Sequence, residues 1–87
     1  MDKHLRFMMN IGNLFPKLDD IAILFHTQLF ATIMLLQPAP KITALAKVME
    51  ECPGCLTKVI GRFQAKGVID KDLNLIDPDE EELYGSV

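Results

Sequence analysis

The hydrophobic residues in the middle of the chain repeat at helical spacing in two short segments. The first segment has apolar residues at positions i, i+3, i+4 and i+7: Ile42, Leu45, Ala46 and Met49. The second segment repeats this spacing with Leu56, Val59, Ile60 and Phe63. Such spacing places apolar side chains on one face of an α-helix. Residues 52–54, Cys-Pro-Gly, favour a turn between the segments, and Gly67 is a natural helix stop. The pattern predicts a helix-turn-helix over residues 41–67.

The N-terminal part of the chain predicts two further helices. One covers about residues 2–14 and the other about residues 19–37, with Asp19 or Asp20 as its N-cap. The longer helix is apolar almost all round, and a helix that is buried on every side needs two partners. One partner is the helix-turn-helix. The other is either a second copy of the chain, which we expect, or residues 1–15 folded back over the outer side.

A short wing and an acidic tail are predicted after the helix pair. Residues 68–76 have apolar–polar–apolar character on both sides of a polar centre, which is typical of a hairpin. The predicted fold class is mainly α with a small β-hairpin: a single winged helix-turn-helix domain, 1–87, of about four helices plus a short wing. Its parts are the N-terminal helices with the dimer interface (1–37), the helix-turn-helix (41–67), the wing (68–77) and the acidic tail (78–87).

Much of the chain, about residues 24–79, resembles the winged-helix regulators of the multiple-antibiotic-resistance (MarR) family. Residues 24–50 match that family's helix, its Pro-containing connector and its Leu-Ala-bearing first helix: LFHTQLFATIMLLQPAPKITALAKVME. Residues 55–72 match its recognition helix and the Gly-aliphatic-aliphatic entry to the wing: CLTKVIGRFQAKGVIDKD. Residues 60–69 also look like the DNA-binding domain of the cyclic-AMP-receptor-like regulators. The resemblance implies a winged helix that binds duplex DNA.

The chain departs from the MarR pattern at three places. Glu50 and Glu51 stand where these families usually have a glycine and an aliphatic residue in the turn. The wing carries only Lys71, whereas the family wing usually has arginines that reach the minor groove. The chain also stops where the family continues into two C-terminal dimerisation helices.

Composition and charge are consistent with one small domain that associates with itself. Eighty-seven residues make a single domain, and 49% hydrophobic residues are more than so short a chain can bury alone. The formal net charge of −3 is unevenly distributed: residues 41–66 carry five basic and two acidic side chains, and residues 67–87 one basic and seven acidic. The helix-turn-helix is therefore the basic part of the chain.

The second helix of the pair would carry the DNA contacts. Its apolar face turns Thr57, Lys58, Gly61, Arg62 and Ala65 outward. Arginine can donate two hydrogen bonds to guanine, lysine and threonine can reach a base edge or a phosphate, and small residues permit close approach. We expect the neighbouring lysines to neutralise phosphates: Lys41, Lys47, Lys66 and Lys71. The alternative is that these side chains form an ordinary solvated face.

Cys52 and Cys55 form a Cys-x-x-Cys motif at the start of the second helix. They are small turn residues with free thiols, a redox-sensitive pair, or half of a metal site. We favour free thiols, since no thioredoxin-like pattern surrounds them and His4 and His26 are distant in sequence. No metal site and no cofactor are expected.

The sequence thus predicts a sequence-specific duplex DNA-binding protein that regulates transcription as a homodimer and reads half-sites about one helical turn apart. The alternative is a winged-helix protein-interaction module, with the acidic tail as a contact for a protein partner. No catalytic constellation is present, so no enzyme is expected. The longest apolar stretch, residues 21–36, is shorter than the about 20 residues that span a bilayer. With two cysteines and no secretory signal, we expect a cytoplasmic protein without membrane contact.

Overall fold

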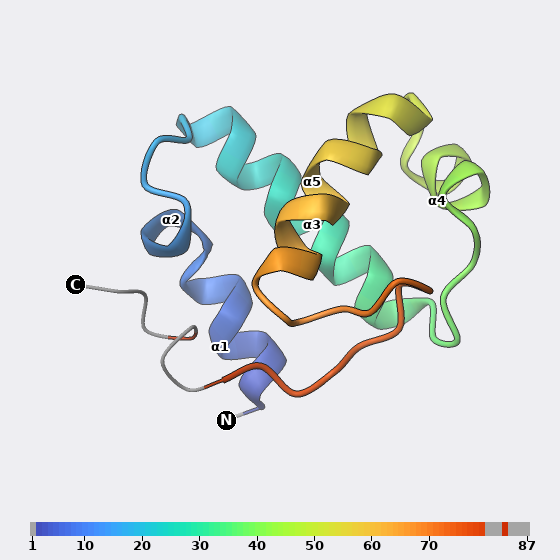
Figure 1. Cartoon of the computed structure of the whole chain (residues 1–87). Coiled ribbons are helices and arrows are strands. Elements are labelled where there is room, and N and C mark those ends of the chain that lie inside the picture. Colours follow the sequence, from blue (N-terminus) through green and yellow to red (C-terminus); the bar gives the residue numbers. More distant parts are fainter. Residues whose placement is uncertain (1, 80–82, 84–87) are drawn as a thin grey trace.

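Five helices make up almost all of the regular structure in the computed structural model, which describes residues 2–79 and residue 83 (Figure 1). In chain order they are α1 (Lys3–Met9), α2 (Ile11–Leu14), α3 (Asp20–Leu35), α4 (Ile42–Met49) and α5 (Pro53–Ala65). The prediction of a mainly helical fold is confirmed. There are five helices rather than about four because the first predicted helix is broken.

The break lies at Asn10, between α1 and α2. The Asn10 backbone has φ −101° and ψ 5°, outside the helical range, and its N–H donates to carbonyls of the preceding turn. Its side-chain amide donates to the backbone carbonyl of Leu83, 73 residues away in the chain. Asparagine is a poor residue for a helix interior because its side chain competes for backbone groups. The side chain of Asn10 bonds the Leu83 carbonyl at the position where α1 ends.

The longest helix, α3, begins where the sequence predicts. The carboxylate of Asp19 accepts a hydrogen bond from the Ala22 N–H at 2.8 Å, so Asp19 is the N-cap. Four buried side chains face the core along one side of α3: His26, Leu29, Phe30 and Ile33. The opposite side of the helix remains exposed.

Aromatic rings from three helices meet in the core. Phe63 of α5 packs edge-on against Phe7 of α1 and Phe30 of α3, with ring centroids 5.7 and 5.4 Å apart. Phe7 and Phe30 also contact each other at 4.8 Å. All three are fully buried. Offset and edge-to-face contacts of this kind are favourable beyond the area that they bury, so this cluster holds α5 against α1 and α3.

The helix pair α4–α5 has the predicted inward faces. Leu45 and Ala46 of α4 are buried, and Ile42 and Met49 pack against the core. All four predicted inward residues of α5 are buried: Leu56, Val59, Ile60 and Phe63. Pro53 occupies the first turn of α5, where a missing N–H costs nothing.

Backbone pairing after α5 is slight among the described residues. Gly67 has a φ of +73°, which favours glycine, and buried Val68 and Ile69 follow it. The expected hairpin amounts here to one antiparallel bridge between Ile69 and Leu75. Most of the predicted acidic tail, residues 80–82 and 84–87, lies outside the described residues. In the part of the chain that the structure describes, no helix is long and apolar enough to cross a membrane.

The turn between α4 and α5 yields a stability prediction. Glu50 ends α4 in the left-handed conformation, with φ 57° and ψ 41°. This conformation costs a residue with a Cβ about 1–2 kcal/mol and is nearly free for glycine, although glycine loses more backbone entropy on folding. We expect Glu50→Gly to raise the free energy of unfolding by about 0.5–1 kcal/mol in urea denaturation.

The matched control is Glu51→Gly, which removes the same charge one residue further on. Glu51 does not have a positive φ, so its replacement should leave the stability unchanged or lower it. Equal stabilisation by both variants would mean that relief of charge repulsion, rather than of backbone strain, is responsible.

Candidate nucleic-acid interface

The outward face of α5 is open along its whole length. Gly54, Lys58, Gly61 and Ala65 follow one another at helical spacing, and all four are exposed. A Cβ added at Gly54 or Gly61 would meet no atom within 4 Å, so packing among the described residues does not require a glycine at either place. Lys58 is therefore the long side chain in a row of otherwise small residues, with Thr57 beside it.

The sequence predicts that Arg62 lies on this open face, but the structure places it elsewhere. It is half-buried, and its Nη1 donates a hydrogen bond to Nε2 of His26 on α3 at 2.9 Å. The helical spacing places Arg62 at the edge of the inward face, within reach of α3. The prediction that Arg62 is fully turned outward to read bases is corrected: its guanidinium is partly committed within the subunit.

The hydrogen bonds of His26 define its protonation state. Its Nδ1 lies 2.8 Å from the Ala22 carbonyl oxygen, which can only accept, so Nδ1 carries the hydrogen. Its Nε2 must then accept from Arg62, which makes the imidazole neutral. Burial lowers the pKa of His26, the Ala22 hydrogen bond opposes this shift, and the positive charge of Arg62 lowers the pKa further. His26 is thus a satisfied core histidine.

A small open cavity of about 260 Å³ adjoins Arg62 at the end of α2. Its lining is mostly apolar, with Lys17 as a second cation: Leu14, Phe15, Pro16, Lys17, Leu18 and Arg62. The Nζ of Lys66 lies 5.7 Å from the centre of the Phe15 ring, a cation–π contact. Arg62 and Lys66 therefore form a basic edge of α5 on the side of the α2–α3 connection.

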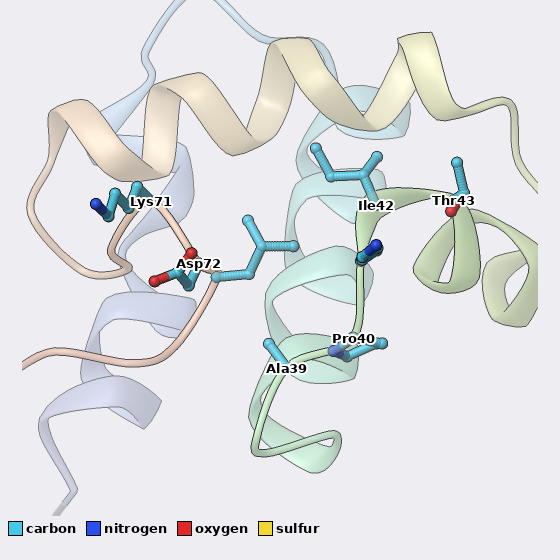
Figure 2. Close-up of a pocket in the computed structure, with 8 residues that line it drawn as sticks. Ala39, Pro40, Ile42, Thr43, Lys71 and Asp72 are labelled. Carbon is cyan, nitrogen blue, oxygen red and sulfur yellow. The ribbon is translucent and has the colours of Figure 1, made fainter.

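Two more of the predicted phosphate ligands border a larger groove, of about 430 Å³, on another side of the helix pair. Figure 2 shows Lys71 and Asp72 on one bank and Ile42 and Thr43 on the other. Lys41 is also part of the lining, and it is the N-cap of α4 without a side-chain cap hydrogen bond. The structure brings Lys41 and Lys71 to one groove, with the carboxylate of Asp72 beside them.

The remaining charges near α5 differ in sign. Lys47 is exposed on α4, whereas Glu50 and Glu51 are exposed in the turn that leads into α5. The predicted basic residues therefore do not form one cluster. Lys58 lies on the open face of α5. The other predicted cations are Arg62 and Lys66 at the end of α5, Lys41 at the start of α4, Lys47 on α4, and Lys71 in the segment after α5.

Cys52 and Cys55 are joined by a disulfide, so the expectation of free thiols is wrong for this structure. Cys52 is also the N-cap of α5, where its Sγ accepts from the Cys55 N–H at 3.3 Å. The helical turn that starts at Pro53 brings the two side chains together, as the Cys-x-x-Cys spacing permits. Across the described residues, no group of three or more His, Cys, Asp or Glu side chains could hold a metal ion.

Comparisons of the chain with family models, with curated proteins and with solved structures gave no match. The resemblance to the MarR family consequently stays an expectation that rests on the residues alone.

The neutral state of His26 predicts a pH-dependent stability. The unfolded chain takes up a proton at a pH of about 6.5, and the folded chain only at a lower pH, because its His26 pKa is lowered. The contribution of neutral His26 to the free energy of unfolding is therefore complete above about pH 6.5, and it decreases as the pH falls towards the pKa of His26 in the folded chain. We expect the free energy of unfolding to fall by up to about 1.4 kcal/mol per pH unit in that window.

Urea denaturation of the wild type and of His26→Gln between about pH 7 and pH 5 measures this effect. Glutamine can still accept a hydrogen bond from Arg62 but does not titrate. The slope of the free energy of unfolding against pH should therefore be smaller in the variant. Equal slopes would show that other groups cause the loss of stability.

The disulfide yields a second prediction. In the chain-entropy treatment, a bridge across so short a loop stabilises the fold by about 2 kcal/mol. Reduction with a phosphine should release two titratable thiols and lower the free energy of unfolding by about that amount. Cys55→Ser, which has no bridge to lose, should not respond. Two free thiols per chain before reduction would contradict the disulfide.

Proposed function

We propose that this protein binds duplex DNA through the outward face of α5, as a homodimeric winged helix-turn-helix regulator of transcription. The observation that carries the proposal is the open row on α5: Lys58 lies between Gly54 and Gly61, where an added Cβ would meet no atom of another described segment within 4 Å. A helix with such a face can approach the floor of a major groove, which is about 12 Å wide.

Two side chains are suited to contact base edges. Lys58 can donate to guanine O6 or N7. The hydroxyl of Thr57 donates to the Pro53 carbonyl at 3.0 Å, which leaves its lone pairs free to accept from an amino group of adenine or cytosine. Gly61 lies one turn further along the same face. In the interior of a helix, it costs about 1 kcal/mol relative to alanine, and close approach to a groove is a reason for that cost.

We assign the other basic side chains to contacts with DNA phosphates. Arg62 is oriented by His26 and lies at the edge of α5, a position that suits the backbone beside the groove better than a base. Lys66 follows it on the same edge, and Lys41, Lys47 and Lys71 lie on elements to either side. Contacts of this kind fix the register of a protein on DNA without reading sequence.

A second function is favoured by the acidic residues near the same face. Glu50 and Glu51 precede α5, and Asp72 lies beside Lys71. Such a mixture of charges would weaken the attraction to DNA and would suit a protein partner with both signs of charge. In this alternative the helix pair is a protein-interaction module.

Lys58→Gln tests the DNA proposal most directly, since Lys58 is exposed on α5 in the part of the chain that the structure describes. We expect the variant to lose about 1–3 kcal/mol of affinity for duplex DNA at unchanged thermal stability. The slope of log K against log salt should become smaller by about 1 if Lys58 meets a phosphate. Fluorescence anisotropy with a library of labelled duplexes gives both quantities.

Lys3→Gln on α1 is the matched control, because it removes the same charge away from α4 and α5. The proposal fails if both variants bind alike, or if the wild type shows no affinity for any duplex at low salt. Competition separates the two functions: if polyglutamate of the same charge displaces DNA equally well, the result would favour a protein partner whose acidic side chains face α5.

A further inference from the structure

The outward face of α3 is an apolar surface that the described part of the chain leaves uncovered. Its largest side chains are strongly exposed: Ile21 is 80%, Leu24 57% and Leu35 83% exposed. Residues 21–40 contain no Asp, Glu, Lys or Arg, so this surface carries no formal charge. Scattered exposed apolar residues are ordinary, but an uncharged row along a whole helix marks an interaction site.

The N-terminal helices do not cover this face. Phe7 of α1 and Ile11 and Leu14 of α2 are buried in the same core as Phe30, on the opposite side of α3. The expected alternative, in which the N-terminal residues fold back over the outer side of the long helix, is therefore wrong for the described residues.

The two most exposed apolar residues of this face, Ile21 and Leu35, are equidistant from Gln28. Ile21 lies seven residues before Gln28 and Leu35 lies seven residues after it. Leu24 lies four residues before it, and Ala31 and Thr32 three and four residues after it. An interface with two-fold symmetry uses the same patch on both copies. Two antiparallel copies of α3 that cross at Gln28 would pair Ile21 with Leu35 at both ends.

A shallow groove on the same face fits one of these side chains. It is lined by Gln28, Ala31 and Thr32 of α3 and by Val48 and Met49 at the end of α4. Val48 is itself 61% exposed. In the antiparallel arrangement the partner subunit's Leu24 comes opposite Thr32, beside this groove. The groove is bounded by two small residues and two apolar ones, which suits a leucine side chain.

We propose that two copies of this chain associate through the outward faces of α3, antiparallel and with the symmetry axis at Gln28. Leu24 of each copy enters the groove between α3 and α4 of the other. The two Gln28 amides meet at the axis, where each can donate to and accept from the other. Asp19 and Asp20 lie beyond the outermost apolar pair and remain in water. The proposal specifies the homodimer of the proposed function and rests on that function only for its biological role.

Sedimentation velocity without DNA tests the association. The wild type should sediment as a species of twice the 9.8 kDa chain mass, and Leu24→Glu should raise the dissociation constant about 100-fold, because it brings an unpaired carboxylate into an apolar groove on each copy. Met9→Glu on α1 is the matched control, since Met9 is an exposed apolar residue outside this face. It should leave the dimer intact.

A cysteine at the axis tests the arrangement itself. Gln28→Cys should form an intermolecular disulfide under mild oxidant, whereas Gln64→Cys, exposed on α5, should not. A monomeric wild type overturns the proposal, whether it stays alone or instead co-sediments with lipid vesicles. A dimer that Leu24→Glu leaves intact, or in which Gln28→Cys fails to cross-link, also overturns it. A dimer that passes both tests without binding DNA would refute only the proposed function.

Discussion

The packing of Phe63 against Phe7 and Phe30 is the contact on which the rest of the structure depends. These rings come from α5, α1 and α3, and they are the largest side chains of the core. With Phe63 held inward, the rotation of α5 about its own axis is determined. The outward position of Lys58 and Gly61 follows from that rotation, and so does the edge position of Arg62. The candidate site is therefore a consequence of how the core packs.

The polar pair of His26 and Arg62 lies at the border of this cluster. The ring of His26 is 5.8 Å from that of Phe63 and is only 2% exposed. A buried imidazole needs partners for both nitrogens, and Ala22 and Arg62 supply them. The same hydrogen bond limits the rotamers of Arg62. A guanidinium held in this way loses less entropy when it binds an anion than a freely rotating one.

Much of the fold could be predicted because it depends on local sequence. The inward faces of α4 and α5 follow from periodicity alone, and the N-cap at Asp19 follows from one residue type before an apolar run. The Cys52–Cys55 disulfide is local, and sequence reasoning weighed it but favoured free thiols. Two other features that sequence reasoning missed depend on residues that lie far apart in the chain. Asn10 meets Leu83 and Arg62 meets His26 only after folding, and neither pair has a sequence signal. The open face at Lys58 was predicted correctly, whereas the wing remains a prediction because one bridge does not establish a hairpin.

The outward faces of α3 and α5 point away from each other, because the inward ring of Phe63 packs against His26 and Phe30 of α3. Figure 1 shows α5 crossing in front of α3. A pair of subunits joined through α3 would therefore carry its two α5 surfaces on opposite sides of the particle. Such a particle could not lay both surfaces on one side of a single double helix, so a dimer through α3 would not read the half-sites one helical turn apart that the sequence predicts. It would hold two separate stretches of DNA together. Where both stretches belong to one DNA molecule, the DNA between them would form a loop.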